Sequence, residues 1–150
     1  MRCLVALAIM LSSANAFAEF YAVRIIPTKT AKPILDADDQ LAVGETKQYR
    51  FAYRGTSYVA VVVAKKRDPG EPGAPSPRYD LTVYRDKIDL GNRVTSVNFP
   101  YPDGPRRFEC GVGNESSFAP LIAYGMSLDG SARAACESTW KSFLVDFPAK

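Results

Sequence analysis

Ser138 and Lys141 stand three positions apart in the string Ser138-Thr139-Trp140-Lys141. On a helix, this S-x-x-K spacing brings a hydroxyl beside an amine that can accept its proton, which activates the nucleophile of some serine hydrolases. The K-T-G string that accompanies it in such enzymes is missing, and the nearest string is Lys29-Thr30-Ala31. We therefore expect the polar face of an amphipathic helix here, with Trp140 packing inward. A small secreted hydrolase without histidine stays an alternative function.

The absence of histidine and the placement of the acidic residues exclude several other chemistries. Without histidine, the chain has no Ser-His-Asp triad, histidine base or His-ligated zinc. Asp36, Asp38 and Asp39 are close together, but an EF-hand loop would need glycine where Leu41 stands and glutamate where Lys47 stands. The acidic cluster is typical of a solvated turn, with a looser calcium site as the alternative. We expect no catalytic residue, no metal site and no cofactor.

Residues 1–18 have the three parts of a secretory signal peptide. A positive start at Met1-Arg2 precedes the apolar run 4–11, and Ala16-Phe17-Ala18 is an A-x-A cleavage site before Glu19. The apolar run is too short to cross a bilayer, and no later segment is long enough. We expect residues 19–150 to form a single secreted β-rich domain without stable membrane insertion, in the periplasm or outside a bacterial cell.

Cys110 and Cys136 are the two cysteines that remain after residue 18. An even pair in an oxidising compartment predicts one disulfide bond, whereas a redox pair usually has the spacing C-x-x-C. A disulfide leaves neither thiol free to act as a nucleophile.

Apolar and polar residues alternate over several short segments, a pattern typical of half-buried strands. The predicted strands are Phe20–Ile26, Lys47–Arg54, Tyr58–Ala64, Arg78–Arg85, Val94–Phe99, Arg107–Val112 and Ala119–Leu128. The second and third form a β-hairpin that turns at Gly55-Thr56-Ser57, and the apolar run 58–64 predicts a strand covered on both faces. Residues 27–40, interrupted by Pro33, predict a loop with a short helical turn around 36–40.

The pattern changes to a helical period near the C-terminus. Apolar residues recur at spacings of three and four: Ala132, Cys136, Trp140, Phe143 and Phe147. This predicts a helix over 129–142, capped by Asp129 or Ser131, with 143–147 as a short strand in the alternative. The disulfide would then join this helix to the strand that carries Cys110. The predicted fold is mainly β: an antiparallel sandwich or partly open barrel with one C-terminal helix and one disulfide.

Two Pro-rich loops, 66–78 and 99–107, supply the candidate binding residues. The candidates are the tyrosines and the basic residues in or near these loops: Lys65, Lys66, Arg67, Tyr84, Tyr101, Arg106 and Arg107. Exposed tyrosine provides contact area at low entropy cost, and rigid loops lower the ordering cost of binding. The alternatives are that 65–67 only ends an apolar strand and that Tyr101 packs on its flanking prolines.

The composition fits a globular protein and gives no support to nucleic-acid binding. The chain is 47% hydrophobic and 23% charged, and its net charge is only +3, too little excess for a phosphate-neutralising face. We expect a non-catalytic module that engages an extracytoplasmic protein through its Pro-rich loops, as an inhibitor, a neutralising protein or a surface-assembly subunit. A glycan-binding subunit, with Tyr84 or Tyr101 as a stacking platform, is an alternative. The sequence assigns no oligomeric state.

Overall fold

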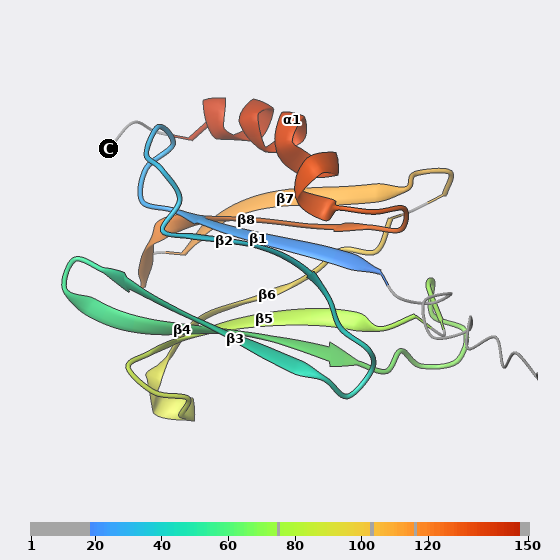
Figure 1. Ribbon diagram of the computed structural model, residues 1–150, viewed down its shortest axis with the longest axis horizontal. Coiled ribbons are helices and arrows are strands. Elements are labelled where there is room, and N and C mark those ends of the chain that lie inside the picture. The colour runs from blue at the N-terminus through green and yellow to red at the C-terminus, as the bar shows by residue number, and fades with distance from the viewer. Residues whose placement is uncertain (1–18, 75, 103, 116, 148–150) are drawn as a thin grey trace, which may run out of the picture.

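The computed structural model describes residues 19–74, 76–102, 104–115 and 117–147, and the predicted signal peptide lies outside them. This part of the chain forms two four-stranded antiparallel sheets packed face to face, with a helix on the outer face of one (Figure 1). The elements are β1 (Phe20–Ile26), β2 (Leu35–Gln40), β3 (Thr46–Tyr53), β4 (Thr56–Lys65), β5 (Arg78–Arg85), the 3-10 turn η1 (Leu90–Asn92), β6 (Arg93–Asn98), β7 (Phe108–Glu115), β8 (Phe118–Ser127) and α1 (Ala132–Val145). The predicted fold class, a mainly β sandwich with a C-terminal helix, is confirmed.

The two sheets enclose the main core. The strand order is β2-β1-β8-β7 in the sheet beneath α1 and β3-β4-β5-β6 in the other sheet. Alternation places one side of each strand inward, so that Tyr79, Leu81 and Val83 of β5 are fully buried. The Tyr79 hydroxyl donates to the Glu19 carbonyl at 2.8 Å, and it lies 2.9 Å from the Leu41 carbonyl. These contacts tie the two sheets together at one end.

The β3–β4 hairpin turns one position earlier than predicted. Its two turn residues are Arg54 and Gly55, with φ values of 49° and 76°. A two-residue hairpin turn of type I′ has positive φ at both positions, and its twist matches the flanking strands. Glycine adopts this conformation freely, and Gly55 therefore takes the second turn position.

The outer face of β4 is not covered by another layer, which corrects the prediction for 58–64. The helix packs on β1, β2, β7 and β8 of the other sheet. Val59 is nevertheless only 1% exposed; Arg50 and Tyr84 are its register partners on the two neighbouring strands. We expected another layer to cover this face, but the long side chains of neighbouring residues bury Val59 instead.

Residues 35–40 form the edge strand β2, so the predicted loop with a helical turn is wrong at this position. β2 pairs with β1 along its whole length, and Ala37 is buried. Aspartate disfavours strands, but here each carboxylate has a partner from a neighbouring element. Asp36 meets Arg24 and Arg133, and Asp39 meets Lys47. Pairing with β1 overrides the local preference.

The helix α1 begins and ends three residues later than the predicted range 129–142. The Ser131 hydroxyl accepts the Ala134 amide at 3.1 Å, as an N-cap does. Ala132, Cys136 and Trp140 are buried against the sheet, as predicted. Phe143 is 40% exposed, and Leu144 takes the inward position, because a spacing of four continues the buried stripe. The helix runs to Val145, which excludes a strand over 143–147.

The disulfide bond between Cys110 and Cys136 is formed, and it joins β7 to α1. Trp140 holds α1 on the neighbouring strand as well, because its indole N–H donates to the Tyr124 carbonyl of β8 at 3.0 Å. None of the described helices is long and apolar enough to cross a membrane.

Candidate functional site

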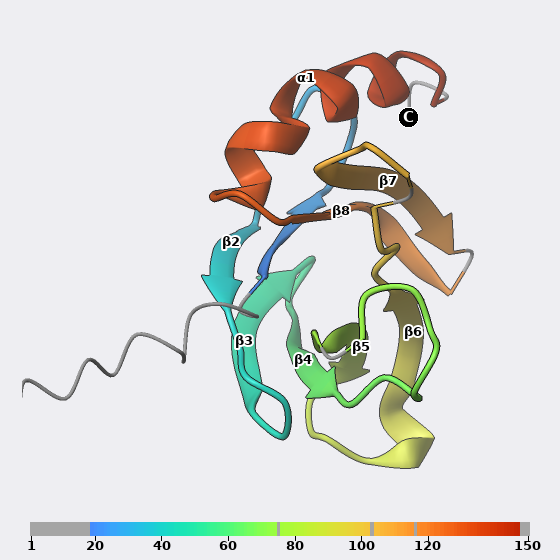
Figure 2. The ribbon, with the colours of Figure 1, turned by 90° about the vertical axis from the view of Figure 1, so that its right-hand side faces the viewer.

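The two Pro-rich loops lie at the same end of the sandwich and contact each other. Loop 66–77 joins β4 to β5, and loop 99–107 crosses from β6 in one sheet to β7 in the other (Figure 2). We call this region, made of the described residues among 65–77 and 99–107, the loop end. It contains six of the seven residues that the sequence singled out as binding candidates.

Loop 66–77 is built from consecutive tight turns. Backbone amides donate from Glu71 to the Asp68 carbonyl at 3.1 Å and from Ala74 to the Glu71 carbonyl at 3.1 Å. A third bond runs from the Ser76 amide to the Gly73 carbonyl at 2.7 Å. The Glu71 carboxylate also accepts the Asp68 amide at 3.1 Å. Local hydrogen bonds of this kind, together with the prolines, hold the loop in one conformation.

Arg67 and Tyr101 connect the two loops. The Arg67 guanidinium lies over the Tyr101 ring, with Cζ 4.8 Å from the ring centroid. Gly73 lies against the same ring, and a β-carbon at this position would come within 2.5 Å of it. Arg67 is only 7% exposed, and Tyr101 packs against the main core. Arg67 is therefore buried and Tyr101 is partly exposed, and their contact joins the two loops.

The remaining basic candidates lie on the surface of the loop end. Lys65 pairs with Asp80 at 3.0 Å, and Arg106 pairs with Glu109 at 3.1 Å. Arg107 forms an ion pair with Asp129, which raises the pKa of the guanidinium and lowers the pKa of the carboxyl. Lys66 is exposed and forms no ion pair with the described residues. These cations are exposed, unlike Arg67.

Tyr84 does not belong to the loop end. It lies half-buried on the outer face of β5, next to Val59 in the register and beside a bulge opposite β6. The structure thus separates it from Tyr101, with which it was grouped as a stacking platform. Arg67 lies over the Tyr101 ring and Gly73 lies against it, and the ring is only partly exposed.

Glu19 is a buried carboxyl at the loop end that the sequence did not mark out. The residue is 3% exposed, and among the described residues its carboxylate oxygens have no hydrogen-bond partner of standard geometry. Burial raises the pKa of Glu19 to about 6, and the Ser76 hydroxyl and the Arg67 charge oppose this shift. Its position directly after the predicted cleavage site was the only signal in the sequence, and that signal says nothing about burial.

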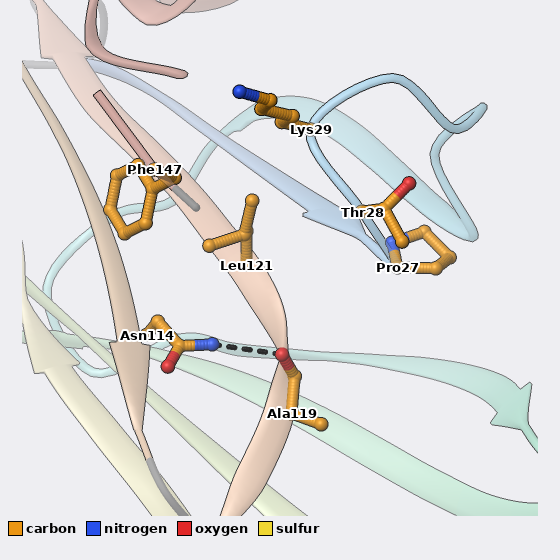
Figure 3. A pocket seen from close by; sticks show the side chains of 7 residues that line it. All are labelled: Pro27, Thr28, Lys29, Asn114, Ala119, Leu121 and Phe147. Carbon is orange, nitrogen blue, oxygen red and sulfur yellow. Dashed lines mark hydrogen bonds between the residues drawn. The ribbon is translucent and has the colours of Figure 1, made fainter. Parts of the chain in front are cut away.

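Ser138 and Lys141 offer no enclosed nucleophile. Both side chains are exposed on α1, and no hydrogen bond joins them. A recess of about 100 Å³ lies at the opposite end of the sandwich from the loop end. Figure 3 shows its lining, in which the Asn114 amide donates to the Ala119 carbonyl at 2.8 Å beside Leu121 and Phe147. Lys29 is the one ionisable group in this lining.

The aspartates of β2 are engaged with neighbouring side chains. Asp38 contacts the Ser131 hydroxyl, and Asp36 and Asp39 form the ion pairs described above. Among the described residues, no group of three or more cysteine, aspartate or glutamate side chains is arranged to hold a metal ion.

Comparison of the chain with protein-family models, with curated proteins and with solved structures gave no match.

Proposed function

We propose that the protein is a non-catalytic interaction module of the cell envelope or extracellular space that binds a protein partner through the loop end. One observation carries the proposal: the Arg67–Tyr101–Gly73 contact holds the two Pro-rich loops together. A surface that is already ordered pays little entropy on binding. Surface loops held on a rigid scaffold are a common place for binding residues.

The exposed part of the loop end combines small or rigid residues with cations. Pro69, Gly70 and Pro72 project from one loop, and Pro105 and Arg106 project from the other. Lys66 adds a charge without an ion pair among the described residues. This surface favours a partner that presents carboxylates around a flat apolar patch, since opposite charges speed association and select the partner.

The test uses charge reversal at two ends of the same molecule. The oxidised protein is immobilised and exposed to the extracytoplasmic fraction of cells that express it, and bound proteins are identified by mass spectrometry. Binding of the enriched protein is then measured for the double variant Lys66→Glu, Arg106→Glu. The matched control is Arg85→Glu, Lys87→Glu, which reverses two exposed cations at the other end of the sandwich.

We expect the loop-end variant to raise the Kd at least tenfold and the control to leave it unchanged. Equal binding by both variants would place the interface elsewhere on the domain. Enrichment of glycan without protein would favour the glycan-binding alternative, and no enrichment of either over a blank surface would remove the proposal.

A further inference from the structure

The sandwich is closed along one side and open along the other. On the closed side the chain passes directly from β2 to β3, and Lys47 of β3 pairs with Asp39 of β2. On the open side the edge strands β6 and β7 face each other across the two sheets (Figure 2). There the Ser117 hydroxyl donates to the Val94 carbonyl at 2.8 Å, which is the one side-chain hydrogen bond from the described residues to β6.

A recess of about 250 Å³ lies between these two edges. Val97 of β6 and Ile122 and Tyr124 of β8 supply its apolar lining. β7 contributes almost no inward side chain near here, because the residues opposite Tyr124 and Ile122 are Gly111 and Gly113. The Tyr124 ring covers Gly111, whereas a β-carbon at Gly113 would meet nothing within 4 Å.

The β6 edge has free main-chain groups beside this recess. The Phe99 amide donates to the Tyr79 carbonyl at 3.0 Å. This bond shows which residues of β6 form main-chain hydrogen bonds with β5. In an antiparallel ladder the bonded residues alternate with residues whose amide and carbonyl point away. The amides and carbonyls of Ser96 and Asn98 therefore point to the open side. The Ser117–Val94 bond shows that this edge already accepts a donor at one end.

Thr95 adds an unsatisfied polar group inside the recess. The residue is 7% exposed and lines the recess, and its hydroxyl has no hydrogen-bond partner in the part of the chain that the structure describes. An unpaired buried hydroxyl reduces stability, and a ligand that bonds to it removes this penalty.

We propose that the recess binds an extended peptide segment of a partner protein, which adds as a strand to the β6 edge and places a small side chain beside Gly113 and Thr95. Binding by strand addition takes its affinity from main-chain hydrogen bonds and its specificity from pockets for alternate side chains. The recess holds one charged residue in its lining, Glu115, which favours a Lys or Arg next to the small residue.

A single segment fits this place better than a second copy of the chain. The occupant lies between the edges of two sheets, so it meets β6 on one side and β7 on the other. If the occupant were the edge strand of another copy, the rest of that copy's sheet would overlap β7. The proposal does not depend on the loop end, and loop-end variants are expected to leave it unchanged.

The test selects peptides directly. A random library of eight-residue peptides displayed on phage is selected on the immobilised oxidised protein, and enriched sequences are synthesised and titrated. Two variants block the site. Gly113→Leu fills the recess from a position with free space, and Ser96→Pro removes an edge amide at a strand position where proline is tolerated. The matched control is Gln48→Pro, an exposed residue of the opposite edge strand β3.

We expect enriched peptides with a small apolar residue, slower amide exchange at Ser96 and Asn98 when they bind, and at least a tenfold loss of affinity in both blocking variants. The control keeps full affinity. Thermal unfolding verifies that each variant is folded, and Gly113→Leu alone suffices if Ser96→Pro does not fold. Enriched peptides that bind Gly113→Leu as well as wild type, or no enrichment at all, would overturn the proposal. If the wild type and the control variant dimerise and the blocking variants do not, the edge binds a second copy of the chain instead.

Discussion

Gly125 of β8 lies directly beneath the Sγ atom of Cys136 in α1. A β-carbon at position 125 would overlap this sulfur and would also come within 3.1 Å of the Glu109 carbonyl. Cys110 is the register partner of Gly125 on β7. The disulfide therefore lies over the one position in this stretch of β8 where a side chain cannot fit, and it brings the helix close to the sheet.

Replacing Gly125 by alanine is expected to lower the free energy of unfolding by about 1–3 kcal/mol, the usual range for overpacking. Chemical denaturation measures the change, and thiol titration reports whether the disulfide still forms. The matched control is Gly113→Ala in the same hairpin, where the added methyl group has free space. If the two variants are equally stable, α1 moves away from position 125 without lowering the free energy of unfolding.

Removing the disulfide is expected to destabilise the domain by about 2–5 kcal/mol. The bond closes a loop with a sequence separation of 26, for which the chain-entropy model gives about 3.5 kcal/mol. The double variant Cys110→Ser, Cys136→Ser avoids leaving one reactive thiol. Its midpoint of unfolding is compared with that of the oxidised wild type. Identical midpoints would mean that the core alone holds α1 in place.

Arg24 is expected to contribute more than an ordinary surface cation. Its guanidinium donates to Glu137 of α1 at 3.1 and 3.2 Å and to Asp36 of β2 at 3.3 Å. It also lies over the Trp140 ring, with Cζ 5.1 Å from the centroid. Arg24→Met keeps most of the aliphatic contact and should cost about 1 kcal/mol, because two carboxylates lose their shared cation.

High salt provides the internal check on Arg24. Screening weakens exposed ion pairs, so the difference in unfolding free energy between Arg24→Met and wild type should shrink in concentrated sodium chloride. A difference that salt leaves untouched would assign the effect to packing on Trp140.

Replacing Tyr101 by leucine is expected to loosen the loop end rather than simply remove a contact residue. The variant loses the cation–π contact with Arg67, worth about 1 kcal/mol when partly buried. Amide exchange in residues 66–77 should become faster, whereas Tyr101→Phe keeps the ring and should behave as wild type. Unchanged exchange in Tyr101→Leu would show that the turns of this loop hold without Tyr101.

Local patterns were sufficient for most of the elements. Alternation in 78–85 predicted β5 with its boundaries, and the four-residue spacing of Ala132, Cys136 and Trp140 predicted the buried stripe of α1. Local preference failed for 35–40, where pairing with β1 and partners for the aspartates override it. The disulfide was predictable because only two cysteines follow residue 18.

The candidate site was only partly predictable. The sequence marked the two Pro-rich loops, since proline and glycine exclude strand and helix locally. Two features depend on contacts between distant parts of the chain. Arg67 and Tyr101 join the two loops, and Gly113 leaves a recess beside Thr95. Most strands, the buried face of the helix and the disulfide follow from the sequence, because they depend on period and residue type. Which loops meet and which strand edges stay open follow from the fold, because they depend on the order of strands in the two sheets.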